Sequence, residues 1–155
     1  MCGILVTTRR DRPFSHKLLK SLQNRGPDAY GFWIDSEVGI GHTRLSIIGL
    51  DERGTQPMEN ERYVMAYNGE IYNYMGLRDR LVAEGVAVEG ITDTEVLLAG
   101  WAHWGADVLT ELEGFWAFTV LDKVERTITM VRDQFGIKPL YYLVDEDGVI
   151  AASLL

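Results

Sequence analysis

The residue with the clearest chemical potential is Cys2, the single cysteine of the chain, which directly follows Met1. A small residue at position 2 permits removal of Met1, and that removal leaves a thiol and a free α-amine on one residue. An α-amine titrates at about 7.7 to 8.0 and a thiol at about 8.5, so the amine can serve as the base that the nucleophile needs. The alternative is that Cys2 is a small apolar residue of the first strand.

A nucleophile that attacks a carbonyl also needs donors for the oxyanion that develops, typically a backbone N–H and a side-chain amide. The pair Asn68-Gly69, after an expected strand that ends at Tyr67, supplies one of each. The same pair is also the strongest signal for a two-residue hairpin turn. The local sequence therefore leaves an oxyanion site and a turn both open.

Three charged residues have the types needed to bind a zwitterionic amino acid. Arg44 can bind a carboxylate through two parallel hydrogen bonds, and Glu70 and Asp93 are candidate partners of an ammonium group. Each also has a plain structural explanation. Arg44 could be a strand arginine that faces water, Glu70 a solvated strand end, and Asp93 an acidic residue in the first turn of a helix.

Other catalytic patterns are absent from the sequence. The histidines His16, His42 and His103 lie far apart and have no metal-ligand spacing, so we assign no metal. There is no G-x-S-x-G elbow, and Gly39-x-Gly41 lacks the rest of a dinucleotide fingerprint.

Length and charge exclude several function classes. The 155 residues, 46% of them hydrophobic, fit one globular domain. A formal charge of -8 would repel nucleic acid and anionic membranes at long range, so we expect neither as a partner. No stretch approaches the roughly 20 apolar residues of a membrane span, and no secretory signal opens the chain, so we expect a cytoplasmic protein.

The hydrophobic pattern predicts about eight short strands separated by three helices. The expected strands are Cys2 to Thr8, Tyr30 to Ile34, Val38 to Ile48, Arg62 to Tyr67, Phe115 to Leu121, Thr127 to Val131, Leu140 to Val144 and Val149 to Ala152. The segments 121–126 and 145–148 are typical of hairpins, which makes both flanking strand pairs antiparallel.

Capping signals place the helices. Ser15 is the expected cap of the first, which Gly26 ends, and the second runs from Met75 to Glu84 before Gly85. The third follows the capping box that begins at Thr92 and runs toward His103. Such an arrangement favours an α+β domain in which two antiparallel sheets pack face to face with helices outside.

Six stretches, in this order, resemble the N-terminal glutaminase domain of glutamine-hydrolysing asparagine synthetases, a branch of the class II glutamine amidotransferases. They are Met1–Ile4, Arg25–Asp28 with Gly31, His42–Ile47, Tyr67–Asn73, Thr92–Glu95 and Arg132–Tyr142. The resemblance implies a four-layer α/β/β/α N-terminal-nucleophile hydrolase fold over residues 1–155. It also implies hydrolysis of L-glutamine to L-glutamate and ammonia through a thioester on Cys2, after removal of Met1.

The resemblance also implies a role for each candidate residue. Asn68 and the Gly69 N–H form the oxyanion hole. Arg44 binds the α-carboxylate of glutamine, Glu70 and Asp93 contact its α-ammonium, and main-chain groups around Leu45 and Ile47 assist. We expect Arg25, Asp28, Arg132 and Asp133 to be buried charges that stabilise turns.

The resemblance further implies partners outside this chain. No cofactor is expected in this domain, because ATP and magnesium belong to a synthetase domain that follows in the family and is absent here. That domain, or a separate subunit, would dock near the apolar segment Val149–Leu155 and receive the ammonia. A homodimer of this chain is also possible under the resemblance. Two alternatives come from other classes: a catalytically silent docking domain, and an N-terminal-nucleophile amidase for another amide such as a lipid or bile-acid conjugate.

Overall fold

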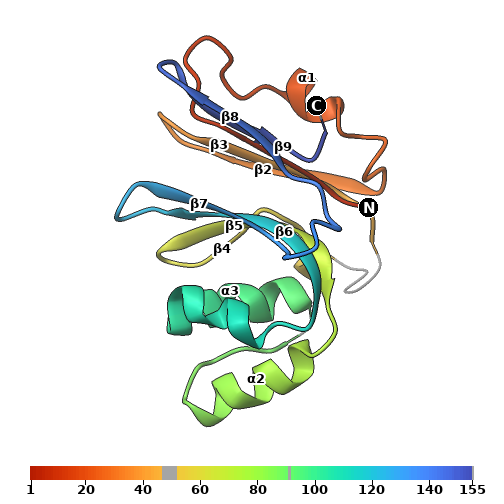
Figure 1. The fold of residues 1–155 in the computed structure, drawn as a ribbon, viewed down its shortest axis with the longest axis vertical. Helices are drawn as coiled ribbons and strands as arrows, with labels where there is room; N and C mark the ends of the chain where they lie inside the picture. The colour runs from red at the N-terminus through yellow and green to blue at the C-terminus, as the bar shows by residue number, and fades with distance from the viewer. Residues whose placement is uncertain (47–51, 91, 155) are drawn as a thin grey trace.

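The computed structural model describes residues 1–46, 52–90 and 92–154. Two antiparallel sheets are stacked face to face, and helices lie outside each of them (Figure 1). Four layers therefore follow one another as helix, sheet, sheet and helix, which confirms the predicted α+β class and its layer order. Within the described ranges, no helix is long and apolar enough to cross a membrane.

The first sheet has the strand order β2-β3-β1-β9-β8, with the bounds Ala29–Ile34, Gly39–Arg44, Gly3–Thr7, Gly148–Ala152 and Tyr141–Asp145. The second sheet has the order β4-β5-β6-β7, with the bounds Met58–Glu59, Tyr63–Ile71, Gly114–Asp122 and Thr127–Arg132. The helices are α1 His16–Lys20, α2 Tyr74–Ala83 and α3 Asp93–Trp104, with 3-10 turns η1 Glu52–Gly54 and η2 Gly105–Glu111.

Both predicted hairpins are present, because β6 pairs with β7 and β8 pairs with β9, each antiparallel. The predicted caps are also confirmed. The Ser15 side chain accepts from the Leu18 N–H, and the Thr92 hydroxyl accepts from the Glu95 N–H. Gly85 ends α2 with a φ of 85°, a left-handed conformation that favours glycine.

Each of the three interfaces between layers has its own apolar core. Ile4, Val6 and Ile40 meet residues of β5 and β6 between the two sheets. Leu5 packs on Leu19 and Leu22 under α1. The largest cluster lies between β5, β6 and the helices α2 and α3. Alternation along β1 therefore sends its side chains into two different cores, which holds the strand rigidly between α1 and the second sheet.

Several predicted boundaries were wrong. The strand expected to end at Tyr67 continues through Ile71, so Asn68 and Gly69 lie inside β5 opposite Ala117 and Trp116, and the hairpin-turn interpretation fails. Pairing along the whole of β6 overrides the local turn preference.

Other differences are smaller. The first helix ends at Lys20, and hydrogen-bonded turns lead from there toward Gly26. The third strand ends at Arg44, while positions 47 and 48 of the prediction lie outside the described residues. The two-residue strand β4 was missed because it is too short to show a period.

One polar side chain joins the two sheets through the inter-sheet core. His42 on β3 is fully buried, and its Nε2 lies 3.0 Å from the carbonyl oxygen of Tyr67 on β5. A carbonyl only accepts, so Nε2 carries the hydrogen and donates it. Burial lowers the pKa of His42 to about 4, and the positive charge of Arg44 acts in the same direction. The imidazole is therefore neutral at physiological pH.

This burial predicts a loss of stability in mild acid. The unfolded chain binds a proton at His42 below about pH 6.5, whereas the folded chain does so only near its lowered pKa of about 4. The free energy of unfolding should therefore fall as the pH falls between these values, by about 3 kcal/mol in total. Urea denaturation across this range measures the slope.

A matched pair of variants isolates the contribution of His42. His42→Gln cannot take up the proton and should show a shallower slope, while His16→Gln, at an exposed histidine on α1, should follow the parent. Equal slopes for the parent and His42→Gln would show that His42 is not the buried neutral group described here.

Candidate active site

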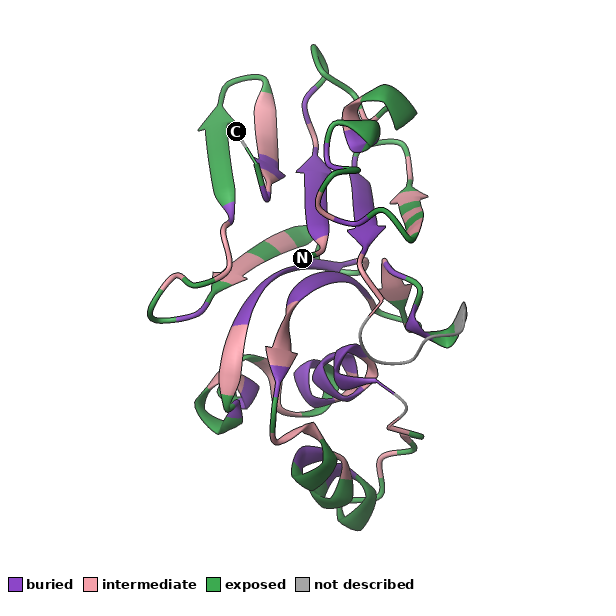
Figure 2. Ribbon diagram, turned by 90° about the vertical axis from the view of Figure 1, so that its right-hand side faces the viewer, coloured by how far each residue is buried: buried purple, intermediate pink, exposed green. Residues whose placement is uncertain are grey.

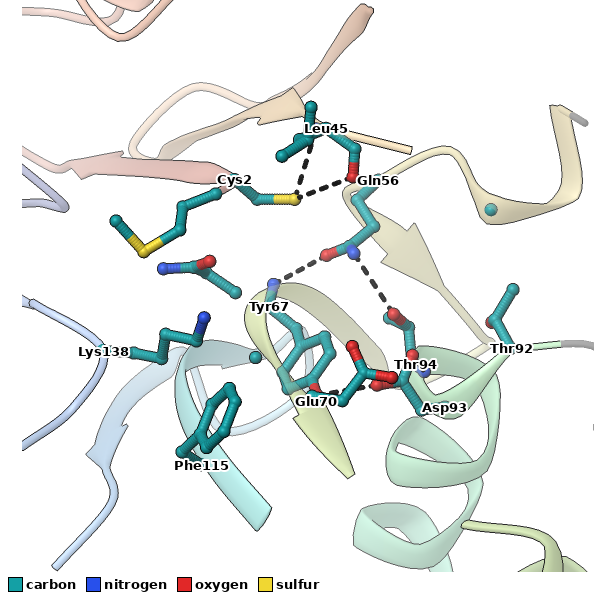
Figure 3. Close-up of a pocket in the computed structure, with 14 residues that line it drawn as sticks. Cys2, Leu45, Gln56, Tyr67, Glu70, Thr92, Asp93, Thr94, Phe115 and Lys138 are labelled. Atoms are coloured by element: carbon teal, nitrogen blue, oxygen red, sulfur yellow. Dashed lines mark hydrogen bonds between the residues drawn. The ribbon is translucent and has the colours of Figure 1, made fainter. Parts of the chain in front are cut away.

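The predicted catalytic residues meet around one cavity of about 220 Å³ at the end of the inter-sheet layer (Figure 3). Its walls come from the chain start, the end of β3, the middle of β5 and the N-terminus of α3. The lining residues that the sequence predicted are Cys2, Leu45, Asn68, Gly69, Glu70 and Asp93. This volume is below the about 300 to 1,000 Å³ of sites for drug-sized ligands, so a single small molecule fits best.

Cys2 reaches the cavity because β1 pairs with β3 directly behind it, with Gly3 opposite Thr43. The Cys2 Sγ lies 3.4 Å from the Leu45 amide nitrogen and 3.7 Å from the Leu45 carbonyl oxygen. On the other side, Arg25 Nε donates to the Cys2 carbonyl at 2.9 Å. The thiol is thus fixed at the cavity wall by contacts on both sides.

Burial is the main influence on this thiol and raises its pKa. The Leu45 hydrogen bond, the positive N-terminus, Arg44 and Lys138 all act in the opposite direction and favour the thiolate. The half-buried Cys2 thiol therefore has positive charges close by. In the sequence as it stands, Met1 precedes it and also lines the cavity.

The backbone of β5 supplies the opposite wall. The Tyr72 N–H donates to the Glu113 carbonyl, and Asn68 pairs with Ala117, so even-numbered residues here direct their N–H and C=O groups toward β6. Because these groups alternate along a strand, odd-numbered residues direct theirs away from β6. The short β4 reaches β5 only at Val64 and Met65, so the edge of β5 is open beyond that point. Gly69 turns its N–H toward this open edge and lines the cavity.

Asn68 adds a second donor. Its side chain is 2% exposed, and among the described residues its Nδ2 is buried without a hydrogen-bond partner. An unsatisfied buried amide costs about 1 to 3 kcal/mol, and such a group at a cavity is available to a ligand. Two donors, the Asn68 amide and the Gly69 N–H, thus face the space beside the thiol.

Two carboxyl groups form the far end of the cavity. Asp93 Oδ2 accepts from the Tyr67 hydroxyl at 2.7 Å and from the Ile71 N–H at 3.2 Å. Burial raises the pKa of Glu70, and the neighbouring Asp93 charge raises it further. Burial also raises the pKa of Asp93. A cationic group placed between the two would relieve both effects.

The predicted carboxylate-binding side is only partly described. Arg44 is buried at the end of β3, behind the Leu45 that contacts Cys2, and it is close enough to influence the thiol, but it does not line the cavity. Ile47 lies outside the described residues.

Sequence reasoning missed several residues of the site. Gln56 Oε1 accepts from the Tyr67 N–H at 2.6 Å, and Gln56 Nε2 donates to Thr94 Oγ1 at 3.2 Å. Lys138 lines the cavity with its ammonium 4.5 Å from the centre of the Phe115 ring. Lys138 lies in the stretch Arg132–Tyr142, one of the six that resemble the family, so the sequence did point to its position. No motif or spacing in the sequence pointed to Gln56.

All four charges expected to stabilise turns form hydrogen bonds to the main chain, but only Asp133 and Arg132 do so within a local turn, whereas Arg25 and Asp28 bond distant segments. Asp133 accepts from the Phe135, Ile137 and Lys138 N–H groups, and Arg132 donates to the Gly136 and Lys138 carbonyls. Asp28 accepts from the Ser46 N–H.

Their burial was predicted less well. Asp133 is buried, Arg25 is half-buried, and Asp28 and Arg132 are exposed. For Asp133 and Arg132, main-chain contacts rather than burial account for the turn-stabilising role.

A solved structure with the same architecture is glutamine phosphoribosylpyrophosphate amidotransferase from Bacillus subtilis, complexed with ADP and GMP. The TM-score is 0.76 at 19% identity, covering 99% of this chain and 42% of that one. At this identity the likeness concerns the fold alone, and it defines the class as the N-terminal-nucleophile hydrolase fold.

The whole chain, residues 1–155, matches the family model of the glutamine amidotransferase domain, and the chain belongs to that family. Asparagine synthetase [glutamine-hydrolyzing] 1 of Bacillus subtilis is 40% identical over an alignment of 163 positions, which covers 99% of this chain and 26% of that protein. The putative asparagine synthetase [glutamine-hydrolyzing] 2 of Methanocaldococcus jannaschii is 36% identical over 100% of this chain and 34% of its own length. Amidase chry2 of Gibberella zeae is 37% identical over 87% of this chain and 21% of its own length. The chain thus spans about a third or less of the curated relatives it matches.

Gly69 offers a test of the site geometry that needs no assay of activity. A Cβ at position 69 would lie 2.5 Å from the Phe115 carbonyl oxygen and 2.7 Å from the Tyr67 ring, both held by the sheet. Gly69→Ala should therefore lower the free energy of unfolding by about 1 to 3 kcal/mol, as overpacking does. Chemical denaturation measures the loss.

Gly76→Ala is the control. Gly76 lies inside α2, and nothing lies within 4 Å of the added Cβ, so alanine should be neutral or stabilise by up to about 1 kcal/mol. If Gly69→Ala were as stable as the parent, the close approach of β5 to Phe115 and Tyr67 would be wrong.

Proposed function

We propose that this domain hydrolyses L-glutamine to L-glutamate and ammonia through a thioester on Cys2. The observation that carries the proposal is the pairing of the Cys2 thiol with two donors around one small cavity: the buried Asn68 amide, which has no partner among the described residues, and the N–H of Gly69, which lines the cavity. A nucleophile with an oxyanion site beside it is the arrangement that acyl transfer requires.

The mechanism begins once Met1 has been removed. The freed α-amine of Cys2 takes the thiol proton, and the sulfur attacks the γ-carbonyl carbon of glutamine. The Asn68 amide and the Gly69 N–H stabilise the resulting oxyanion. The protonated amine then passes its proton to the leaving nitrogen, the C–N bond breaks, and ammonia departs. Water then attacks the thioester while the amine takes a proton from the water. The C–S bond breaks, glutamate departs, and the amine gives that proton to the sulfur.

Recognition of the amino-acid end of glutamine uses opposite charges at two places. Glu70 and Asp93 hold the α-ammonium, and the raised pKa of each carboxyl falls again when that cation binds. Arg44, buried beside the cavity, attracts the α-carboxylate to the Leu45 end through its charge, and main-chain groups around Leu45 and Ile47 assist. Met1, which lines the same cavity, leaves further room when it is removed.

The ammonia is delivered to a synthetase domain or subunit that uses ATP and magnesium to activate an acid, as the names of the asparagine synthetase relatives suggest. That partner docks near β8 and β9. The outer strand β8 is exposed along its whole length, and Tyr142 and Val144 are 69% and 58% exposed (Figure 2). Exposed apolar strands of this kind mark contact surfaces.

A second candidate is an amidase for a different amide, which the similarity to Amidase chry2 supports. Glutamine is favoured because the cavity is small and carries two carboxyl groups for an ammonium, features that a lipid or bile-acid conjugate does not need. A silent docking domain is disfavoured, because it has no use for a thiol beside two such donors.

The nucleophile is tested by Cys2→Ala, which should abolish glutamate release while the domain stays folded, since a half-buried thiol at the chain end contributes little packing. A non-removable extension before Cys2 should be nearly as damaging because it consumes the α-amine. Glutamate release and intact mass, with and without diazo-oxonorleucine, report activity, Met1 removal and Cys2 alkylation together. Turnover within a few fold of the parent in either variant would contradict the mechanism.

The division of labour between oxyanion and substrate binding is tested by two variants. Asn68→Ala should lower kcat by about 10² to 10³ with little change in KM, the usual loss for one oxyanion donor. Arg44→Ala should act mainly on KM, because a carboxylate contact is equal in the ground state and the transition state. Asn24→Ala, at an exposed asparagine in the turn after α1, is the control. A reversed pattern would exchange the two roles.

A further inference from the structure

The open edge of β5 needs support from side chains. A strand edge that lacks a neighbouring strand leaves N–H and C=O groups to be satisfied in other ways. At Tyr67, Gln56 Oε1 accepts from the N–H at 2.6 Å, and His42 Nε2 donates to the carbonyl at 3.0 Å. At Ile71, Asp93 accepts from the N–H at 3.2 Å. Gly69 lies between these two supported residues.

His42 is unusual among these supports because it comes from the other sheet. It points from β3 across the inter-sheet core, on the same face as Ile40, and is fully buried. Its Nδ1 is also buried and has no partner among the described residues. A buried imidazole with one unsatisfied nitrogen is a poor core residue, since an apolar side chain would avoid that loss.

Gln56 bonds the N–H of the same residue, Tyr67, and is itself held in place. Its Nε2 donates to Thr94 Oγ1 in the first turn of α3. Its backbone carbonyl lies so close to Gly31 on β2 that a side chain at position 31 could not be accommodated. The two peptide planes that flank Tyr67 are therefore held by groups anchored in the first sheet and in α3. Gln56 holds the N–H of the peptide before Tyr67, and His42 holds the carbonyl of the peptide after it.

We propose that His42 is a positioning residue of the oxyanion site: its hydrogen bond to the Tyr67 carbonyl orients the Tyr67–Asn68 peptide and so places Asn68, whose side-chain amide and whose peptide bond to Gly69 supply the two donors. This inference rests on the proposed glutaminase function. His42 does not touch the substrate and acts through β5. Its loss should therefore weaken transition-state stabilisation and leave ground-state binding of glutamine in place.

The kinetic test compares variants of similar size. His42→Leu removes the donor and should lower kcat by about 10- to 100-fold, while KM stays within about twofold of the parent. This loss of kcat is larger than that for one ordinary hydrogen bond and smaller than that for an oxyanion donor. His42→Gln, whose amide nitrogen can replace Nε2, should restore kcat to within about threefold of the parent. In an Asn68→Ala background, His42→Leu should have a much smaller effect, because the two residues act on one group.

Thr119→Val is the matched control. Thr119 on β6 is fully buried on the face that Ala117 and Leu121 turn toward the inter-sheet core, and its hydroxyl has no partner among the described residues. Its side chain makes no hydrogen bond to Tyr67 in the described part of the chain, so kcat should stay at the parental value. If Thr119→Val lowered kcat as much as His42→Leu does, a general perturbation of the core would explain both and the proposal would fail.

A measurement on the parent protein covers the case in which His42→Leu does not fold. Nitrogen-15 spectra of histidine-labelled protein should show His42 as the neutral tautomer with the proton on Nε2. A proton on Nδ1 alone would remove the bond to Tyr67 and overturn the proposal, as would parental kcat in His42→Leu. If the parent did not hydrolyse glutamine at all, the proposed function would fail, while the tautomer would still report on the hydrogen bond.

Discussion

The site depends on Tyr67, because this one residue uses three polar groups to join three parts of the fold. Its N–H is held by Gln56, its carbonyl by His42 of the other sheet, and its hydroxyl by Asp93 of α3. Burial and the Asp93 charge raise its pKa well above the usual tyrosine value, so the hydroxyl stays protonated and donates. The strand that carries Asn68 and Gly69 is consequently tied to both sheets and to the helix that bears the substrate-binding carboxylate.

The electrostatics of the cavity divide it into two ends. Near Cys2, the N-terminus, Arg44 and Lys138 oppose the effect of burial on the thiol. At the far end, burial raises the pKa of both Glu70 and Asp93, and the Asp93 charge raises the pKa of Glu70 further. An amino acid that carries its own two charges complements such a site. Under the proposed function, selectivity for glutamine over a neutral amide would rest on charge placement more than on volume.

The sequence predicted the class, the two hairpins, two helix caps and most of the cavity wall, because these features depend on local patterns and motifs. It failed where pairing between distant residues decides the outcome. The dipeptide Asn68-Gly69 locally predicts a turn. It lies inside a strand instead, because nine residues of β5 pair with β6. His42 was taken only as a histidine without metal-ligand spacing, and Gln56 had no signal, because their roles arise from contacts with Tyr67 across 25 and 11 positions.

The outer strand β8 has a consequence for handling the isolated domain. Among the described strands it pairs only with β9, so within that part of the chain its other edge has no strand neighbour, and Tyr141 to Val144 are exposed on both faces. Such an edge is a template for strand addition between identical chains, and self-association then grows with protein concentration. Mutual repulsion from the net charge of -8 opposes it, and added salt screens that repulsion. Dilute, low-salt solutions are therefore the conditions under which the lone domain stays monomeric.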